Sequence, residues 1–481
     1  MATTSATSTI SSLGVGSGID ANSIVTQLVA LERQPISLLQ TQASKLQTKI
    51  SAYGQIQSQV SSLRDAAQKL TSPSLWAATT GSSADSSTVS VSTSDGAASG
   101  SYAVNVNSLA AAQSIVANTS LASSASTVGS GTLTFDVGKW TGNTFAANAG
   151  STSVSITIAA TDTLAGIRDK INSANAGVTA SIINDASGAR LVMNSAATGD
   201  TNGFRVTATD SDGNNTDNAG LSSLAYDPAS ATAGTTQTQA GANASATING
   251  VSVSSTSNTF SNVLTGISLT VSKLTSAGAP VNVTVGQDNA TIQKAITDFA
   301  TAYSNLATYL RNNTKYDDST KTAGTLQGDS LAVGTLNQFR SLAGSGSGSS
   351  SLFGTLSSAG LELQQDGTLR VNSTKLTSAL GNITDLKNLF SNSTTGSEGI
   401  AVKMRMTADN MLGIDGSITT RTAGLNSTIT NNQKRQDDLD ARATLYEKRL
   451  RAQYTALDTT MAGITSQGNY VTQMITQLNK A

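Results

Sequence analysis

The sequence contains neither cysteine nor histidine. Without them the chain can form no disulfide, no Ser-His-Asp or Cys-His catalytic arrangement, and no zinc site with nitrogen or sulfur ligands. We therefore expect a protein that is not an enzyme and that uses no metal and no cofactor. The missing cysteines also mean that the chain needs no oxidising compartment in order to fold.

Charged and aromatic residues are scarce as well. Asp, Glu, Lys and Arg together make up 12% of the chain, aromatic residues make up 4%, and the formal net charge is -1 at pH 7. Such a surface cannot neutralise many phosphates, so we expect no nucleic-acid partner. No stretch approaches the roughly 20 apolar residues of a membrane span, and residues 1–20 lack the features of a secretory signal peptide. We expect no membrane insertion.

Both ends of the chain carry helical periodicity. After Pro35, apolar residues recur every seven positions, with a second set between them, which is typical of a coiled-coil seam. A stripe of three- and four-residue spacing, with one stutter after Gln453, runs through the C-terminal segment. We predict that the following residues form these seams and mediate oligomerisation: Leu39, Leu46, Tyr53, Val60, Leu425, Ile429, Leu439, Tyr446, Leu450, Leu457, Met461, Ile464, Val471, Ile475 and Leu478.

Local signals refine the two helical ends. Asp20 is a suitable N-cap for a first short helix, and Pro35 is expected to kink or break that helix. Polar or small residues dilute the C-terminal seam, so we expect the seam to gain strength mainly when several chains pack together. These diluting residues are Asn432, Gln436, Gln453 and Gly468.

The region between the helical ends reads as antiparallel β-structure. From about residue 77 to residue 287, short runs of alternating apolar and polar residues are separated by Gly, Asn, Asp and Ser. A helical period returns over residues 288–313, and residues 325–390 are expected to add helices with one hairpin near residues 361–371. The predicted fold class is α+β: a helical, coiled-coil-like stalk formed by the N- and C-terminal segments, with an inserted antiparallel β-rich head of two domains.

We predict the following division of the chain. It comprises a flexible N-terminal export and leg segment (1–40), a stalk helix (41–75), the first part of a β head domain (76–118), an outer β head domain (119–241), the second part of the first head domain (242–288), a helical stalk domain (289–424) and a C-terminal coiled-coil leg helix (425–481).

Three features look like ligand sites but are better explained as structure. The glycines of residues 14–18 do not follow a strand and do not match a phosphate-binding loop. Residues 210–214 lack the glycine position and the final acidic residue of an EF-hand, so a polar turn is favoured. Asp317 and Asp318 are adjacent in a polar loop and are expected to be structural.

Several stretches resemble the flagellar filament cap proteins of the hook-associated protein 2 family. The most specific are residues 12–20 (SLGVGSGID), residues 24–32 (IVTQLVALE) and residues 446–458 (YEKRLRAQYTALD), with further agreement at residues 102–110 and 246–288. Ile171 and Asn172 resemble the IN motif of flagellar hook proteins. The resemblance covers nearly the whole chain.

The resemblance implies a secreted, extracellular protein that forms a homo-oligomeric ring at the distal tip of the filament. Such a cap promotes the folding and polymerisation of exported flagellin and prevents its leakage. The implied partners are flagellin, other copies of the chain, hook-associated junction proteins and a cytoplasmic export chaperone bound to the C-terminal helix, from about Leu425 to Leu478. Adhesion is left open as a further role. The alternatives are a surface adhesin, or another axial protein such as a hook-filament junction protein.

Overall fold

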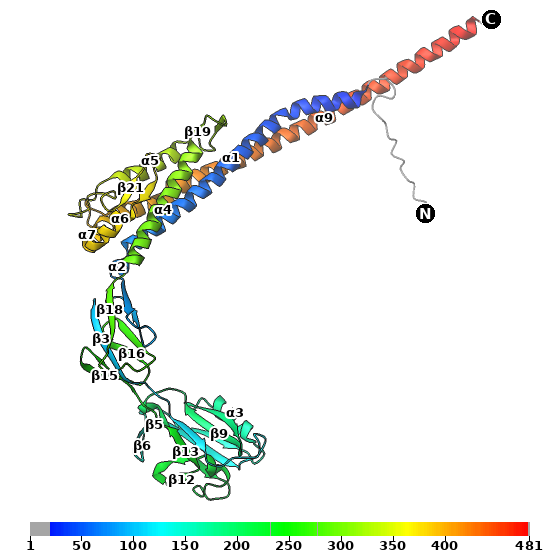
Figure 1. The fold of residues 1–481 in the computed structure, drawn as a ribbon. Helices are drawn as coiled ribbons and strands as arrows, with labels where there is room; N and C mark the ends of the chain where they lie inside the picture. The colour runs from blue at the N-terminus through cyan, green and yellow to red at the C-terminus, as the bar shows by residue number, and fades with distance from the viewer. Residues whose placement is uncertain (1–19, 231, 277, 480–481) are drawn as a thin grey trace, which may run out of the picture. The chain divides into compact units, whose positions relative to one another are not determined.

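The computed structural model describes residues 20–479 except 231 and 277, and the chain divides into two compact units. The helical unit combines Met1–Ser72 with Gln293–Ala481, and the β unit is Pro73–Ile292 (Figure 1). Long helices dominate the first unit and antiparallel sheets dominate the second, and the predicted α+β class is confirmed. Of the predicted N-terminal segment (1–40), residues 1–19 lie outside the described residues.

The helical unit begins with α1 (Ala21–Thr71) and resumes with α4 (Asn289–Thr314). The hairpin predicted near residues 361–371 is present. The remaining elements are β19 (Tyr316–Asp317), β20 (Thr322–Ala323), α5 (Ser330–Gly344), β21 (Leu361–Leu363), β22 (Leu369–Val371), α6 (Ser373–Ala379), α7 (Ile383–Ser391), α8 (Ile400–Leu412) and α9 (Ser417–Leu478).

Helix α1 is one continuous element, so the break expected at Pro35 is wrong. The expected N-cap is present, because the Asp20 carboxylate accepts a hydrogen bond from the Ser23 backbone N–H at 3.0 Å. A proline inside a helix costs about 3 kcal/mol through its missing N–H and its ring. Side chains buried on both sides of Pro35, such as Val29 and Leu39, hold the helix together and offset that cost.

Helix α4 contributes a buried apolar face to the helical unit. Its apolar face is fully buried, as the spacing over residues 288–313 predicted, and includes Phe299, Tyr303 and Leu306. Phe299 packs edge-on against Phe390 of α7, with ring centroids 6.1 Å apart. Each such side chain contributes roughly 1.5 to 3 kcal/mol by leaving water, so this face is a major source of the unit's stability.

The β unit holds two apolar cores, and the first lies between a five-stranded sheet and a three-stranded sheet. The five-stranded sheet has the order β1-β18-β3-β14-β15, and the three-stranded sheet has the order β16-β17-β2. Short helix α2 (Pro73–Trp76) precedes them. The strands are β1 (Thr79–Ser83), β2 (Val89–Thr93), β3 (Gly100–Ser108), β14 (Ala244–Ile248), β15 (Val251–Ser255), β16 (Thr259–Leu264), β17 (Ile267–Val271) and β18 (Val281–Gln287).

The second core belongs to the segment inserted between β3 and β14. One sheet has the order β13-β4-β9-β8, and the other has the order β12-β11-β10-β5-β6 with β7 also paired to β5. The elements are β4 (Ser114–Ala117), β5 (Gly131–Thr141), β6 (Thr144–Ala147), β7 (Val154–Ile158), α3 (Leu164–Ser173), β8 (Val178–Asp185), β9 (Gly188–Ser195), β10 (Gly203–Asp210), β11 (Tyr226–Asp227), β12 (Thr232–Ala233) and β13 (Thr235–Gln239).

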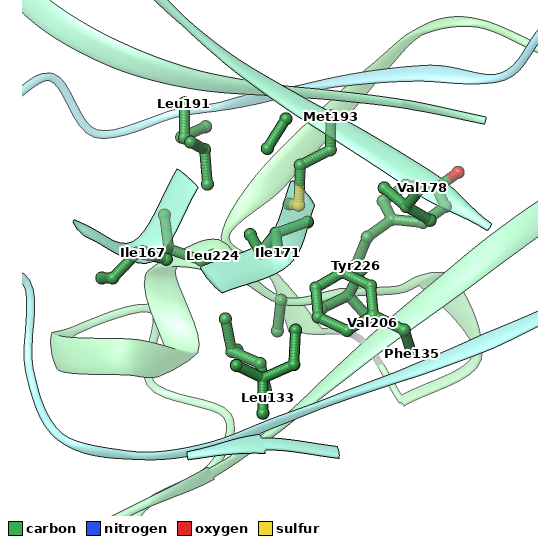
Figure 2. Packing of buried hydrophobic residues seen from close by; sticks show 14 of the residues in the cluster. Leu133, Phe135, Ile167, Ile171, Val178, Leu191, Met193, Val206, Leu224 and Tyr226 are labelled. Carbon is green, nitrogen blue, oxygen red and sulfur yellow. The ribbon is translucent and has the colours of Figure 1, made fainter. Parts of the chain in front are cut away.

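Helix α3 carries the predicted IN motif and joins this core to β8. Ile167 and Ile171 are fully buried and point into the interior beside Leu191 and Met193 of β9 (Figure 2). The neighbouring Asn172 turns its amide to the backbone of Ala180: it donates to the carbonyl at 2.9 Å and accepts from the N–H at 2.7 Å. The isoleucine thus fills the core, and the asparagine bonds to the outermost strand of the sheet.

We predict that Asn172→Ala lowers the free energy of unfolding of the β unit by about 1 to 3 kcal/mol, because it leaves two backbone groups of Ala180 without their partner. Both tryptophans of the chain, Trp76 and Trp140, lie in this unit, so urea unfolding followed by tryptophan fluorescence measures it selectively. Asn184→Ala, at an exposed position of β8, is the matched control. Equal unfolding midpoints for the two variants would contradict the assigned role.

Candidate assembly site

Helices α1 and α9 pair side by side in antiparallel orientation (Figure 1). Arg33 lies 3.3 Å from Asp440, Glu32 lies 3.8 Å from Arg442, and the Asn22 side chain accepts a hydrogen bond from Arg451 at 3.0 Å. Residue numbers therefore rise along α1 while they fall along α9. These contacts are exposed, and each contributes only about 0 to 1 kcal/mol, so they align the helices more than they stabilise them.

An apolar cluster closes the end of the pair where α1 begins. Val25 and Val29 of α1 and Leu450 of α9 are buried together. Leu28, Tyr446 and Tyr454 pack against them and are partly buried. The two helices of this section thus bury apolar side chains from both ends of the sequence, as the seam spacing requires.

The structure separates the predicted seam residues into three groups. Five are buried in the helical unit: Leu39, Tyr53, Val60, Leu425 and Leu450. Five are partly buried: Leu46, Ile429, Leu439, Tyr446 and Met461. Five are exposed, by 43% to 71%: Leu457, Ile464, Val471, Ile475 and Leu478. Their common role in oligomerisation stays a prediction.

The residues that dilute the seam also divide into two kinds. Asn432 and Gln436 are buried, each with 7% of its surface exposed, and the Gln436 side-chain N–H donates to the Asn432 side-chain oxygen at 2.6 Å. Gln453 and Gly468 are exposed. The first pair is therefore a polar layer inside the α1–α9 contact, which we call the amide layer.

A buried carboxylate, which the sequence analysis missed, joins three helices of the same unit. Asp329 accepts a hydrogen bond from the Tyr53 hydroxyl of α1 at 2.5 Å and from Arg421 of α9 at 2.8 Å. It also caps α5 by accepting from the backbone N–H of Leu331 at 3.1 Å. The cap could have been recognised from an aspartate that precedes an apolar run, but no local signal links it to Tyr53 or Arg421.

The electrostatics of this cluster favour an ionised aspartate and a neutral tyrosine. Burial acts to raise the pKa of Asp329, but hydrogen bonds from Tyr53 and Arg421 outweigh burial and hold that pKa below its usual value. Burial, together with the hydrogen bond to Asp329, raises the pKa of the Tyr53 hydroxyl. The hydrogen bond with Asp329 also raises the pKa of Arg421. The tyrosine is thus a hydrogen-bond donor and the carboxylate an acceptor at neutral pH.

Of the other features considered in the sequence, residues 14–18 lie outside the described residues, and the two acidic ones form turns. Asp210 ends β10 and accepts a hydrogen bond from the Ser222 backbone at 3.0 Å, and Asp317 accepts from the Ser319 backbone at 3.0 Å between β19 and β20. Within residues 20–479, apart from 231 and 277, no group of three or more acidic side chains is placed to hold a metal ion. Over the same part of the chain, no helix is long and apolar enough to cross a membrane.

Comparison with protein-family models gives three matches. The model of the flagellar hook-associated protein 2 N-terminus matches residues 17–113, and that of its C-terminus matches residues 241–466. The model of the flagellin hook IN motif matches residues 144–197. The stretches at 24–32 and 446–458, as well as Ile171 and Asn172, fall within these matches.

Similarity to individual proteins extends over nearly the whole chain. The B-type flagellar hook-associated protein 2 of Pseudomonas aeruginosa is 31% identical over 97% of this chain and 98% of its own length. The flagellar hook-associated protein 2 of Salmonella typhimurium is 31% identical over 98% of this chain and 99% of its own. The solved D1-D2-D3 domains of the Escherichia coli flagellar cap protein are 29% identical, with a TM-score of 0.63, and cover 78% of this chain and 99% of that one.

We predict that Asp329→Asn lowers the free energy of unfolding of the helical unit by about 1 to 3 kcal/mol at neutral pH, because the charge that binds Tyr53 and Arg421 is lost. The pKa of Asp329 is lower in the folded chain than its usual value of about 3.9. Its contribution is therefore complete above about pH 4 and disappears as the pH falls through the lower, folded-state pKa.

Urea unfolding followed by far-ultraviolet circular dichroism, at neutral pH and at about pH 3, measures this difference. Asp440→Asn, which removes the exposed ion pair with Arg33, serves as the control and should change stability little at either pH. A deficit in Asp329→Asn that does not shrink at the lower pH would rule out the ionised carboxylate as its source.

Proposed function

Because this chain belongs to the flagellar hook-associated protein 2 family, we propose that it is a structural capping protein at the distal end of the bacterial flagellar filament. There it promotes the folding and polymerisation of exported flagellin and prevents flagellin from leaking away. It is secreted and extracellular, and filament elongation and motility depend on it. It has no enzymatic activity.

The observation that supports this proposal most strongly is that similarity to flagellar hook-associated protein 2 extends over both the helical unit and the β unit. The related hook-associated proteins align over 97% and 98% of the chain, and the Escherichia coli flagellar cap protein shares the fold. The helical ends and the β unit are therefore explained together. The same similarity does not support a surface adhesin or a hook-filament junction protein as the alternative.

Helix α9 offers the means of self-assembly. Arg451 lies opposite Asn22 at the start of α1, and α9 continues from there to Leu478. At a rise of 1.5 Å per residue, this tail extends about 40 Å. Its exposed apolar residues, Leu457 and Ile464 among them, continue the three- and four-residue spacing of the seam. We infer that they pack against helices of neighbouring copies in a homo-oligomeric ring.

The same tail is suited to an export chaperone. Asp458 is the one charged residue between positions 452 and 479 of the sequence, so the exposed apolar stripe meets little electrostatic repulsion from a groove of either sign. A chaperone bound there in the cytoplasm would keep the stripe from joining other copies before export. Flagellin and the hook-associated junction proteins are the partners that we propose after export.

We predict that adding charge to the exposed stripe abolishes capping without unfolding the chain. Ile464→Asp, Val471→Asp and Ile475→Asp, combined, place three carboxylates on positions that are more than half exposed, so the unfolding midpoint should stay unchanged. In a host that lacks its own copy of the gene, this variant should give absent or short filaments and release unpolymerised flagellin into the medium.

The matched control is Ser466→Asp, Gln473→Asp and Gln477→Asp, combined. Each of these residues is exposed and lies two positions beyond a mutated one, on the opposite side of α9. It adds the same charge to the same helix and should restore filaments. Normal filaments with the stripe variant, counted by electron microscopy, would overturn the proposed contact.

A further inference from the structure

Two features weaken the pairing of α1 and α9, one in each helix, and both lie at nearly the same position along the pair. In α1, Pro35 has no N–H, so the carbonyl of Leu31 loses its usual partner within the helix. In α9, the amide layer of Asn432 and Gln436 occupies two consecutive seam positions that would otherwise be apolar. Elsewhere in the pair the seam of α9 is built from Leu, Ile, Ala and Tyr.

The cluster at the start of α1 sets the register. Val25 packs with Leu450, and two heptads further along each helix lie Leu39 of α1 and Gln436 of α9. Since the helices are antiparallel, Leu39 lies opposite Gln436. Pro35 precedes Leu39 by one helical turn. The two weak points are thus neighbours in space, although they come from opposite ends of the chain.

The amide layer gives little to the pairing of the two helices. Its hydrogen bond runs along α9, from Gln436 to Asn432, and not across to α1. Both side chains are largely buried, with 7% of each exposed, yet among the described residues neither makes a hydrogen bond to α1, so the layer adds no polar contact across the pair. An exposed pair of the same spacing, Gln433 and Asp437, makes a similar bond at 3.1 Å and shows that the bond itself needs no burial.

The two sides of the amide layer are anchored differently. On the inner side, Tyr53 and Arg421 are fixed through the buried Asp329. On the outer side, residues 21–34 of α1 and 439–454 of α9 are held by the Val25 and Leu450 cluster and by ion pairs that are largely exposed. We call these two segments the outer section. It has fewer buried partners than the inner side.

We infer that the outer section opens as a unit at the amide layer while the inner side of the pair, which is anchored at Tyr53 and Arg421, stays closed. Opening exposes Val25, Val29 and Leu450, which continue the exposed stripe that begins at Leu457. These side chains then pack against helices of a second copy of the chain. This inference rests on the proposed function, because opening gives the assembled cap a longer apolar contact surface than the tail alone exposes. Asn432 and Gln436 set the point at which opening stops.

Hydrogen exchange of the full chain in its monomeric state, measured by mass spectrometry, tests the opening. Peptides of the outer section should exchange at least about tenfold faster than peptides around Tyr53, with a step at the amide layer. Asn432→Leu combined with Gln436→Leu should slow exchange of the outer section about tenfold. Gln433→Leu, the same kind of change on the exposed side, should not.

Gradual fraying from the start of α1 would give no step, and that result would overturn the inference, as would equal exchange in the double variant and the unmodified chain. Pro35→Ala is a second, independent variant that restores the missing N–H. Pro35→Ala should also slow exchange of residues 21–34, because it removes one of the two weak points. Unchanged exchange in this variant would count against the inference.

Assembly kinetics test the use of the opened seam. If opening supplies contacts to neighbouring copies, the double leucine variant should assemble more slowly in sedimentation experiments although its helices are better paired. Unaltered assembly would overturn this step and leave the capping function intact. Failure of the unmodified chain to restore filaments in a host that lacks the gene would instead overturn the proposed function, whatever the exchange rates.

Discussion

The pairing of α1 with α9 is the constraint on which the helical unit depends, because the whole β unit is inserted between the segments that build it. Tyr53 and Asp329 are 276 positions apart and still share a hydrogen bond. The insert reduces the cost of that closure by bringing its own ends together: β1 pairs with β18, and Thr79 lies opposite Gln287. Folding of the β unit thus prepares the pairing of the helices.

Asp329 then determines how the paired helices are fixed. A buried carboxylate is costly unless every partner is in place, and here one group receives Tyr53, Arg421 and the first turn of α5. An arrangement with the helices shifted along each other would leave that charge without donors. The interaction therefore selects one alignment of α1 and α9, in a unit whose long apolar stripes would by themselves permit several.

Much of the fold could be predicted from apolar spacing, because the period of 3.6 or 2 follows directly from which face of a helix or strand is buried. The break at Pro35 could not be excluded in this way, since packing on both sides of the proline decides it. The Asp329 cluster was out of reach for a similar reason: Arg421 is 92 positions away. Spacing also cannot distinguish Leu450, 8% exposed, from Leu457, 43% exposed, because the difference lies in where α1 begins.

The exposed and the buried parts of the α9 stripe therefore continue one apolar spacing, which the described part of the chain covers only in part. Monomer stability and assembly draw on the same kind of side chain, so a seam that was apolar throughout would strengthen both pairing within the chain and premature association between chains. We infer that Asn432 and Gln436 weaken the covered part, whereas the low charge of the tail leaves the uncovered part able to pack against apolar surfaces of other copies. Under the proposed function, a chain that stays single until export and assembles afterwards requires a seam of this intermediate strength.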